Sequence, residues 1–595
     1  MTFEQRRALA RQGRPAGAIV RGILLLAAGC APLTAIGATG DQDWRSYGGA
    51  PGGGHFSTAR EITPDNVGTL ALAWQHRSGD IRKPGGGQGR ARTQSAFQAT
   101  PIVVDDTLYY CSPFNKVFAL NAATGEERWS YDPGVDHDAD VLPNCRGVSS
   151  WRSGAEGFCE HRIIMGTLDA RLIALDAATG KPCPDFGDGG AVDLTRGMTA
   201  HGAAEYSVTS PPAILGDMAI TGAMVLDNVR RDAPSGVVRA YDVRSGALRW
   251  VWNPVPAEIA PLNADGTYRA GTTNVWSIIA VDPERNLVFV PTGNTQPDYY
   301  GGHRDGLDAY SSSVVALNGA TGALVWHYQL VHHDLWDYDT PAQPTLMDLR
   351  VDGASIPALV QVTKMGMTFV LNRETGEPVW PVEERAVPQD PVPGEYLAPT
   401  QPFPTHLPHL IEHITEDDAW GFTPWDRGAC RRAIAALRND GIYTPPSLEG
   451  TLFYPGNGGG NNWGSPAIHP GEQLAVVVTM RVPSFVKLIP RDQCAGQRLA
   501  AAGHALLRAD RTPLITARRA LHRAALGNPG RHRPGQRRPP LERAARDDAR
   551  HGTVSVLVDQ GRARHRRADD HRLGAGVRRR HAGSRVSRIR SGERR

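Results

Sequence analysis

Two ionisable side chains lie in sequence contexts that suit proton chemistry. Asp337 ends the polar run HHDLWD at residues 332–337. A carboxylate with an ordinary pKa of about 4 is ionised at neutral pH and can accept a proton. Lys364 lies within residues 358–372 (ALVQVTKMGMTFVLN), which we interpret as a strand whose apolar neighbours indicate burial. A buried lysine is costly unless it meets an acceptor. The alternatives are a loop aspartate that caps a turn and an exposed edge lysine that blunts strand pairing.

Further polar residues could hold a cation or an anion. Calcium and magnesium take carboxylate and amide oxygens, which Asp227, Asn228 and Asn294 carry. Because Asn228 and Asn294 are also ordinary turn residues, each alone leaves both interpretations open. Arg146 suits bidentate recognition of a carboxylate. Trp276 could stack on a flat group or simply pack in the core.

Two other kinds of chemistry are disfavoured. The cysteines are Cys30, Cys111, Cys145, Cys159, Cys183, Cys430 and Cys494. No two of them form a C-x-x-C pair, which argues against zinc and thioredoxin-type sites. In an oxidising compartment we expect Cys145 and Cys159 to be bridged, although the sequence leaves other pairings open. The Gly-rich run PGNGGGNNWGS at 455–465 lacks the Lys-Ser/Thr of a phosphate loop, so we interpret it as a loop over a funnel mouth.

Charge is unevenly distributed over the 595 residues. Residues 501–595 hold 25 Arg and 8 acidic residues, which leaves 40 basic and 53 acidic residues in 1–500. The body therefore has a net charge of −13 and the tail one of +17. An acidic body argues against a nucleic-acid or anionic-lipid surface and suits an enzyme that handles neutral substrates.

The N-terminus has the layout of a secretory signal peptide. Five arginines within residues 6–21 precede the apolar run 23–37 and small residues around Ala38. A helix that spans a bilayer needs about 20 apolar residues, and no later segment offers them. We therefore expect a signal peptide over 1–37 and a periplasmic protein, with peripheral contact to the inner membrane as an option. Cys30 also permits a lipoprotein cleavage site, although Ala27 stands where such sites prefer Leu.

One segment recurs five times along the chain. The copies are ALNAATGEERWS (119–130), ALDAATGKPCP (174–184), AYDVRSGALRWV (240–251), ALNGATGALVWH (316–327) and VLNRETGEPVWP (370–381). Each has an Asp or Asn and a Thr/Ser-Gly turn, which predicts a β-hairpin. Four copies have a Trp four residues after the Gly, at 129, 250, 326 and 380, and we expect it to pin one repeat against the next. Successive copies of the segment begin 54 to 76 residues apart, a spacing that suits a four-stranded blade.

The remaining pattern is that of an all-β protein. Short strands rich in Val, Ile, Leu and Tyr are predicted at 107–111, 162–165, 287–290 and 359–362. Helical periodicity is largely confined to 426–439, and 66 Gly and 45 Pro residues punctuate the chain. Because one unit is repeated, a radial propeller is favoured over a sandwich.

The motif A-x-D-x-x-T-G-x-x-x-W resembles the tryptophan-docking repeat of dehydrogenases that depend on pyrroloquinoline quinone (PQQ), whose propellers have eight blades. Longer runs are similar to the membrane-bound glucose, quinate and shikimate dehydrogenase branch. They are NCRGVS (144–149), TSPPA (209–213), VHHDLWDYDTPAQPTLM (331–347), PTQPFPT (399–405) and FVKLIPRD (485–492). The resemblance covers roughly three quarters of the chain. Membrane-bound members of that branch carry several N-terminal membrane helices, whereas we expect this chain to carry only a signal peptide.

The resemblance implies a quinoprotein dehydrogenase that oxidises a hydroxyl of a sugar or cyclic polyol by hydride transfer to PQQ. Electrons would then pass to membrane ubiquinone. On the matching positions, Asp337 would be the catalytic base and Lys364 would bind the quinone oxygens. Arg146 and Thr209 would hold the PQQ carboxylates, and Trp276 would stack on the quinone face. A Ca²⁺ or Mg²⁺ ion would take ligands from Asp227, Asn228, Asn294 and Asp337.

The chain departs from the pattern of glucose-oxidising relatives at two positions. Phe114 stands where they carry a His, and Val478 stands where they carry an Asn. Phe114 removes a polar group from the expected substrate mouth. We therefore do not expect glucose itself to be the substrate.

Two alternatives to an active enzyme remain. One is a non-catalytic propeller, similar to outer-membrane assembly lipoproteins that share PQQ-like repeats and bind proteins. Cys30 favours this scaffold, whereas Asp337, Lys364 and Asn294 argue against it because a scaffold needs none of them. The other is an inactive, truncated product.

The C-terminal segment differs from the body in composition. Residues 501–595 contain no Phe, Trp, Tyr or Lys, whereas 1–500 contain 41 aromatic residues. Such a composition cannot bury a core and predicts disorder. We expect an incomplete propeller over 38–490 and an Arg-rich tail over 491–595 that is a frameshifted reading of the final blades. A genuine basic tail for nucleic acid is the alternative, for which a secreted acidic enzyme has no evident use.

Overall fold

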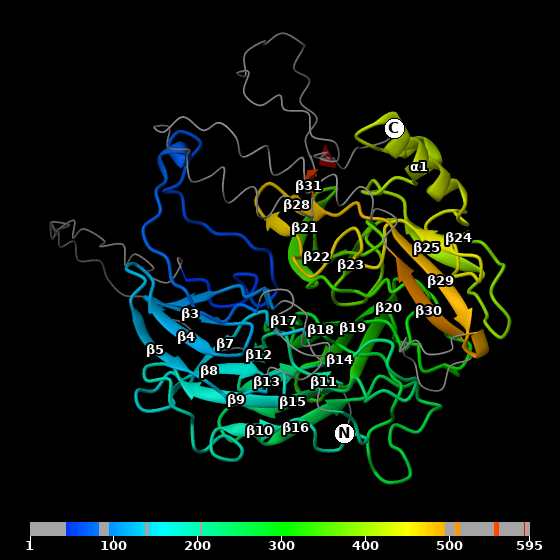
Figure 1. Ribbon diagram of the computed structural model, residues 1–595. Coiled ribbons are helices and arrows are strands. Elements are labelled where there is room, and N and C mark those ends of the chain that lie inside the picture. The colour runs from blue at the N-terminus through cyan, green and yellow to red at the C-terminus, as the bar shows by residue number, and fades with distance from the viewer. Residues whose placement is uncertain are drawn as a thin grey trace, which may run out of the picture. The chain divides into compact units, whose positions relative to one another are not determined.

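The computed structural model describes residues 43–82, 95–136, 142–202 and 205–493, and the backbone of three further strands at 506–511, 553–558 and 588–589 (Figure 1). Every described residue belongs to one compact unit, which spans residues 42–595. The predicted signal peptide, Cys30 and Cys494 lie outside the described residues. A search of the described helices found none that is long and apolar enough to cross a membrane.

Antiparallel sheets follow one another along the chain, and the strands of each sheet pair in chain order (Figure 1). The first sheet comprises β2 (Ile102–Val104), β3 (Thr107–Cys111), β4 (Val117–Asn121) and β5 (Glu127–Tyr131). The second comprises β7 (Ser149–Arg152), β8 (His161–Gly166), β9 (Arg171–Asp176) and β10 (Ala191–Asp193). The third comprises β12 (Ala213–Leu215), β13 (Met218–Thr221), β15 (Val238–Asp242) and β16 (Leu248–Trp252). The fourth comprises β17 (Ala280–Asp282), β18 (Leu287–Pro291), β19 (Ser313–Asn318) and β20 (Leu324–Gln329), and the fifth β21 (Thr345–Val351), β22 (Ala354–Val362) and β23 (Thr368–Asn372).

Smaller sheets and short helices complete the described fold. The pairs are β1 (Ala96–Phe97) with β6 (Asn144–Cys145), β11 (Tyr206–Ser207) with β14 (Met224–Val225), and β24 (Val382–Ala386) with β25 (Thr400–Pro404). A further sheet joins β26 (Thr451–Phe453), β29 (Ser484–Pro490) and β30 (Leu506–Arg511). Another joins β27 (Ala467–His469), β28 (Leu474–Thr479), β31 (Thr553–Val558) and β32 (Arg588–Ile589). The 3₁₀ helices are η1 (Val67–Thr69), η3 (Glu416–Asp418) and η4 (Arg491–Gln493).

The hydrophobic core lies between successive sheets. Inner strands such as β18 are buried along their whole length, whereas the outer strand β20 is largely exposed apart from its tryptophan. One core cluster joins Ile220 and Val238 of the third sheet to Val288 and Val315 of the fourth. This is the arrangement of propeller blades, in which each sheet is covered on both faces.

The predicted tryptophan contact between repeats is present for three of the four tryptophans, whereas the fourth, Trp380, stacks on His406 with the ring centroids 4.3 Å apart. The pairs are Trp129 with Gly180, Trp250 with Gly322 and Trp326 with Gly376. Each glycine has a φ of +70° to +79°, and a Cβ added there would come within 2.5–2.7 Å of the indole. Each indole N–H donates to the carbonyl oxygen three residues before the glycine, at 2.9–3.2 Å. Glycine is therefore required both for the turn and for the close approach.

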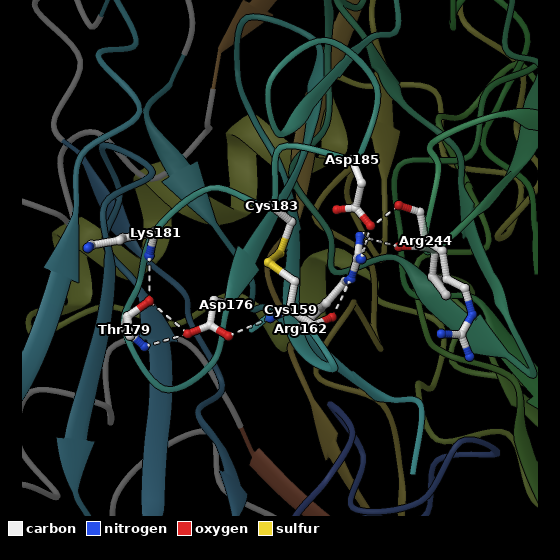
Figure 2. Close-up of a disulfide and its surroundings, with 9 residues drawn as sticks. Cys159, Arg162, Asp176, Thr179, Lys181, Cys183, Asp185 and Arg244 are labelled. Carbon is white, nitrogen blue, oxygen red and sulfur yellow. Dashed lines mark hydrogen bonds and ion pairs between the residues drawn. A yellow bond between two sulfur atoms is a disulfide. The ribbon is translucent and has the colours of Figure 1, made fainter. Parts of the chain in front are cut away.

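The second sheet lacks a docking tryptophan and is joined to the third by other means (Figure 2). Arg162, whose side chain is 4% exposed, donates to the carbonyl oxygens of Val243 at 3.1 Å and Arg244 at 2.8 Å. It also pairs with Asp185 at 2.6 Å. A guanidinium thus binds the turn of the next sheet where the other sheets use an indole.

The predicted disulfide between Cys145 and Cys159 is wrong. The structure pairs Cys111 with Cys145 and Cys159 with Cys183, with Cα atoms 6.0 and 5.8 Å apart. Strand β7 runs between Cys145 and Cys159, and its four residues at about 3.3 Å each carry the two cysteines to opposite ends of the strand. Partners distant in sequence therefore lie closer in space. Cys430 is the free cysteine of the described chain.

Trp74 is a docking tryptophan that the repeat pattern did not reveal. Its indole lies against Gly125, and its N–H donates to the Ala122 carbonyl oxygen at 3.2 Å, the same contact as in the other pairs. Residues 70–76 thus take the place of an outermost strand beside the first sheet. Within the described part of the chain this segment pairs with no strand, and Leu70 and Leu72 are 52% and 75% exposed.

The helix predicted at 426–439 is α1 (Pro424–Ala435), which begins earlier and ends earlier. The Thr423 hydroxyl accepts from the Asp426 amide and caps the first turn, with Pro424 at its first position. The helix ends because Arg438 leaves it to pair with residues beside β26, its N–H donating to the Gly450 carbonyl oxygen at 3.1 Å.

We predict that Trp74→Ala lowers the free energy of unfolding by about 2 kcal/mol, less than the ~3–5 kcal/mol of a fully buried tryptophan because Trp74 is half-buried. Thermal unfolding followed by near-ultraviolet circular dichroism measures the change. The matched control is Trp425→Ala, since Trp425 is 82% exposed, and its effect should stay within about 0.5 kcal/mol. Equal effects of the two substitutions would contradict the docking role.

Candidate functional site

Lys364 is buried as predicted, but it does not lie in a strand. It occupies the turn between β22 and β23, where Gly366 has a φ of +80° and ends the extended run. Its side chain is 5% exposed. Its ammonium donates to the Asp337 backbone oxygen at 2.7 Å, to the Asp337 carboxylate at 2.8 Å and to the Asp339 carboxylate at 3.0 Å. The edge-lysine alternative is therefore excluded.

Asp337 is held in a tight loop that follows β20. Its backbone φ is +60°, a conformation that costs energy for a residue with a Cβ. The fully buried Asp334 stabilises this loop, because its carboxylate accepts from the backbone amides of Trp336 at 2.8 Å and Tyr338 at 2.9 Å. The second carboxylate oxygen of Asp337 accepts from the Tyr299 hydroxyl at 3.2 Å. Both carboxylate oxygens of Asp337, the predicted base, are thus oriented by hydrogen bonds, one from Lys364 and one from Tyr299.

The pKa values of Asp337 and Lys364 are shifted because the single ammonium of Lys364 lies between the carboxylates of Asp337 and Asp339. Burial raises the pKa of Asp337, and the neighbouring Asp298 and Asp339 raise it further, while Lys364 opposes the rise. Burial also opposes the charge on Lys364, but Asp337 and Asp339 outweigh it and raise the lysine pKa. The lysine therefore stays protonated, and Asp337 is a stronger base than an exposed aspartate.

The amide and carboxylate residues predicted as metal ligands lie together around Asp298. Asn228 donates to the Asp298 carboxylate at 2.6 Å, and Asn294 donates to the Asp298 backbone oxygen at 3.2 Å. Asp227 accepts from the Gln296 side chain at 3.0 Å, and that amide also reaches Asp298 at 3.2 Å. The Asn294 backbone N–H donates to the Asp339 carboxylate, which connects this group to the lysine site.

Arg146 is a buried cation for which the described residues supply no carboxylate. Its residue exposure is 6%, one guanidinium nitrogen donates to the Thr209 hydroxyl at 2.5 Å, and its Nε has no hydrogen-bond partner. Burial lowers the pKa of Arg146 to about 10. A buried guanidinium with donors to spare is suited to bind a carboxylate. The structure thus brings Arg146 and Thr209 together, as predicted.

Two indoles flank this guanidinium. Arg146 lies 4.9 Å from the ring centroid of Trp276 and 5.5 Å from that of Trp463. The Trp276 N–H donates to Asp339 at 3.3 Å, which connects the arginine to the Asp337 and Lys364 group. Trp276 is half-buried, so part of its ring is available for stacking.

The Gly-rich loop at 455–465 packs directly on the lysine turn. Gly459 has a φ of +71°, and the Gly460 amide donates to the Lys364 carbonyl oxygen at 2.5 Å. A side chain at Gly459 would overlap the Lys364 side chain. The loop thus covers the site and its glycines permit the close approach, in line with the predicted loop over a mouth.

The two positions that depart from glucose-oxidising relatives lie in different surroundings. Phe114 follows β3 in the loop that the Cys111–Cys145 disulfide ties to the strand preceding Arg146, and Arg82 lies 5.6 Å from its ring centroid. Val478 is 54% exposed in β28, and its carbonyl oxygen accepts from Asn461 at 2.8 Å.

Five residues of the site were missed from the sequence: Gln296, Asp298, Tyr299, Asp339 and Trp463. The repeat of Asp at two-residue spacing in D-Y-D (337–339) is a signal for Asp339. For Asp298 and Gln296, the only signal in the sequence was that they lie close to Asn294 in the chain. Trp463 lies at the end of the Gly-rich run, which gave no indication of the arginine it contacts.

A search for tight clusters of His, Cys, Asp and Glu found one among the described residues, and it is not a metal site. It consists of Cys159, Cys183 and Asp185, with ligand atoms within 4.8 Å of one another (Figure 2). The two sulfurs form a disulfide and offer no thiolate.

The chain is similar to known proteins over most of its length. The model of the glucose/ethanol/alcohol dehydrogenase β-propeller domain matches residues 44–586. The chain is 39% identical to a quinoprotein glucose dehydrogenase of Escherichia coli over 78% of this chain and 59% of that protein. It is 37% identical to a quinate/shikimate dehydrogenase (quinone) of Acinetobacter baylyi, over 75% and 57% of the two chains. The chain therefore spans less than two thirds of the length of these relatives.

Solved structures resemble the fold. A quinohemoprotein alcohol dehydrogenase of Pseudomonas putida superposes with a TM-score of 0.54 at 25% identity, covering 76% of this chain and 59% of that one. A europium-containing methanol dehydrogenase gives a TM-score of 0.55 at 23% identity, covering 79% and 73%, and carries weight for the fold alone. The predicted all-β propeller is thereby confirmed.

We predict that Lys364→Met lowers the free energy of unfolding by about 3–5 kcal/mol at pH 7, because it leaves buried carboxylates without their cation. The pKa of Asp337, already raised by burial, then rises further. A raised carboxyl pKa means that stability is present at low pH and lost as pH rises through the folded-state pKa. The deficit relative to the original chain should therefore shrink at pH 5.

Urea denaturation at pH 5 and pH 7 measures this effect. The double variant Lys364→Met/Asp337→Asn is the control, since it removes a negative charge together with the cation and should recover part of the loss. A deficit that is independent of pH in Lys364→Met would contradict the electrostatic explanation.

Proposed function

Because the chain belongs to the glucose/ethanol/alcohol dehydrogenase β-propeller family, we propose that it is a quinoprotein dehydrogenase that oxidises a hydroxyl of a sugar or cyclic polyol. The observation that carries the proposal is the buried pair of Asp337 and Lys364, which a structural scaffold would not need. PQQ, when bound, supplies the two-electron acceptor, and ubiquinone is the proposed final acceptor. We place the protein in the periplasm, in accord with the predicted signal peptide.

Asp337 is the proposed catalytic base. One carboxylate oxygen accepts from Lys364 and the other from the Tyr299 hydroxyl, so the side chain cannot rotate freely. Burial raises the pKa of Asp337 above that of an exposed aspartate, so its carboxylate is the stronger proton acceptor. A base whose pKa approaches the working pH removes a hydroxyl proton more effectively. Lys364 keeps the carboxylate oriented and is the proposed donor to quinone oxygens.

Arg146, Thr209 and Trp276 would hold the cofactor. The unpaired Nε of Arg146 and its lack of a carboxylate among the described residues fit an acidic, planar cofactor. Trp276 would supply the stacking surface, and Trp463 on the other side of Arg146 would help to exclude water. An arginine so placed binds a carboxylate with geometric specificity.

A Ca²⁺ or Mg²⁺ ion would be held by Asp227, Asn228, Asn294 and Asp337. Their oxygens are hard ligands of the kind these ions prefer. Asp298 lies among them and adds a carboxylate to the set. Its negative charge contributes to the raised pKa of Asp337, so an ion bound there would lower that pKa again.

We predict that the propeller body, completed by its missing blades and supplied with PQQ and Ca²⁺ or Mg²⁺, binds PQQ and reduces an artificial dye with a polyol or an aldose. Absorbance titration measures binding, and dye bleaching measures turnover. Arg146→Met should weaken PQQ binding at least about 10-fold, since one hydrogen bond to a charged group contributes ~1.5–3 kcal/mol. Absence of PQQ binding by this completed propeller would exclude the enzyme and favour the scaffold.

We predict that Asp337→Asn abolishes turnover while PQQ stays bound, because the amide keeps the shape and one oxygen but cannot accept the proton. The same titration and dye assay measure both properties. Lys364→Ala should weaken both binding and turnover. Near-normal rates in Asp337→Asn would mean that another residue is the base.

We also propose that the propeller over residues 38–490 is incomplete and that 491–595 is an out-of-frame reading of the final blades. The exposed segment at residues 70–76 supports this proposal, because Trp74 docks on the first sheet as a tryptophan of a further blade would, and the segment pairs with no strand among the described residues. Translation of the other two frames of the gene downstream of codon 490 tests it. We expect a tryptophan-docking repeat and aromatic strands there, and their absence from both frames would overturn the proposal.

A further inference from the structure

His333 lies at the centre of a buried charge cluster that the proposed mechanism does not use. It precedes Asp337 by four residues, and its side chain is 5% exposed. Its Nδ1 lies 2.7 Å from the Asp308 carboxylate, and its Nε2 lies 3.0 Å from the Glu395 carboxylate. Tyr396 stacks on the ring with the centroids 3.7 Å apart. The imidazole is thus fixed on three sides.

This geometry determines the protonation state of the ring. A neutral imidazole carries a single N–H and can donate to only one of two carboxylates, whereas the imidazolium donates to both. Burial lowers the pKa of His333, but the hydrogen bonds to Asp308 and Glu395 outweigh it and raise the pKa above 6.5. The charged form therefore persists to higher pH than in an exposed histidine.

The cluster joins three segments that are separate in the chain. Asp308 and Arg304 come from the segment between β18 and β19, and Glu395 comes from the segment between β24 and β25. Glu395 also accepts from the Gly301 amide at 2.5 Å. Arg304, which is 1% exposed, lies 3.7 Å from Asp308 and donates to the Asp334 backbone oxygen at 2.7 Å.

The cluster acts on Asp337 through Asp334. The backbone of Asp334 is held by Arg304, and its carboxylate holds the amides on both sides of Asp337. His333 itself has a φ of +46°, so the loop bears two residues in the left-handed region within five positions. Such a backbone persists only where surrounding contacts determine it.

Other titratable groups surround the cluster and enter any pH dependence. Those on the segment between β18 and β19 are Tyr300, His303 and Asp305, in addition to Arg304 and Asp308. His332 faces away, with its ring against Gln329 and the Glu384 carboxylate, and its side chain is 33% exposed. His332 therefore serves as a matched control for His333.

We propose that His333 is a positioning residue for Asp337: as an imidazolium it ties the loop that carries the base to the Asp308 and Glu395 segments. The inference rests on the proposed function, in which Asp337 accepts the substrate proton. Neutralising or replacing the ring leaves two buried carboxylates without their common donor and releases the loop. Misplacement of the base lowers kcat, whereas substrate contacts that set KM are unaffected.

The first test compares His333→Gln with His332→Gln in the propeller completed by its in-frame final blades and loaded with PQQ and Ca²⁺. His333→Gln should lower kcat about 10- to 100-fold, the scale of a misplacement of about 1 Å, with KM changed less than about threefold. His332→Gln should leave both constants unchanged. Equal kinetics in the two variants would overturn the positioning role. So would a His333→Gln variant in which kcat falls, KM rises and PQQ binding weakens to the same extent.

The second test uses the pH profile of kcat. In the original chain kcat should fall on the alkaline side as His333 loses its proton. Glu395→Gln should flatten this limb, because a neutral His333 can donate from Nδ1 to Asp308 and accept at Nε2 from the new amide. An alkaline limb that is identical in Glu395→Gln would contradict the assignment.

The third test needs no activity and separates this inference from the proposed function. Hydrogen exchange measured by mass spectrometry on the chain without cofactor should be about 10-fold faster for the amides of residues 334–338 in His333→Gln than in His332→Gln. A chain that binds PQQ but turns over no substrate would overturn the proposed function. The exchange result would still show whether His333 holds the loop that carries Asp337. Unchanged exchange would overturn the positioning role in either case.

Discussion

The indole of one sheet resting on the turn glycine of the next is the contact on which the rest of the structure depends. It combines a flat apolar surface, an N–H donated to a backbone carbonyl, and a glycine whose positive φ leaves room for the ring. If the tryptophan or the glycine is displaced or substituted, the apolar contact, the hydrogen bond and the close approach are all lost together. Because the contact recurs, it sets how successive sheets meet, and thereby brings residues from different repeats, such as Arg146, Trp276 and Lys364, to one site.

The site is organised by an unequal distribution of charge. Lys364 is shared by Asp337 and Asp339, and Asp298 adds a further negative charge nearby. The neighbouring His333 cluster differs, because the two cations Arg304 and His333 face two carboxylates and no charge is left over. An excess of carboxylates suits a divalent ion, whereas a balanced cluster suits a rigid support. The two groups share the loop at 331–339, so the support and the chemistry are mechanically connected.

Much of the fold followed from local rules. The Asp or Asn at the start of each repeat turn accepts from the amides two or three residues on, as Asn121 does for Ala123 and Thr124. The strand at 287–290 and the hairpins of the repeats formed where Val/Ile/Leu/Tyr-rich runs and turn residues predicted them. Trp74 was missed because Leu70 stands four residues before it, where the tryptophans of the repeats follow the Gly of a turn.

The sequence by itself determined the repeat, the turn chemistry, the family resemblance and the residues Asp337, Lys364, Arg146 and Thr209, because these depend on short runs of neighbouring residues. Only the tertiary structure decided which cysteines pair, that Lys364 lies in a turn against two carboxylates, and that Trp463 and Asp298 belong to the site. Those outcomes depend on distances across sheets. Strand β7 separates Cys145 from Cys159 although only 14 positions divide them, whereas docking of the sheets brings together side chains that are more than a hundred positions apart.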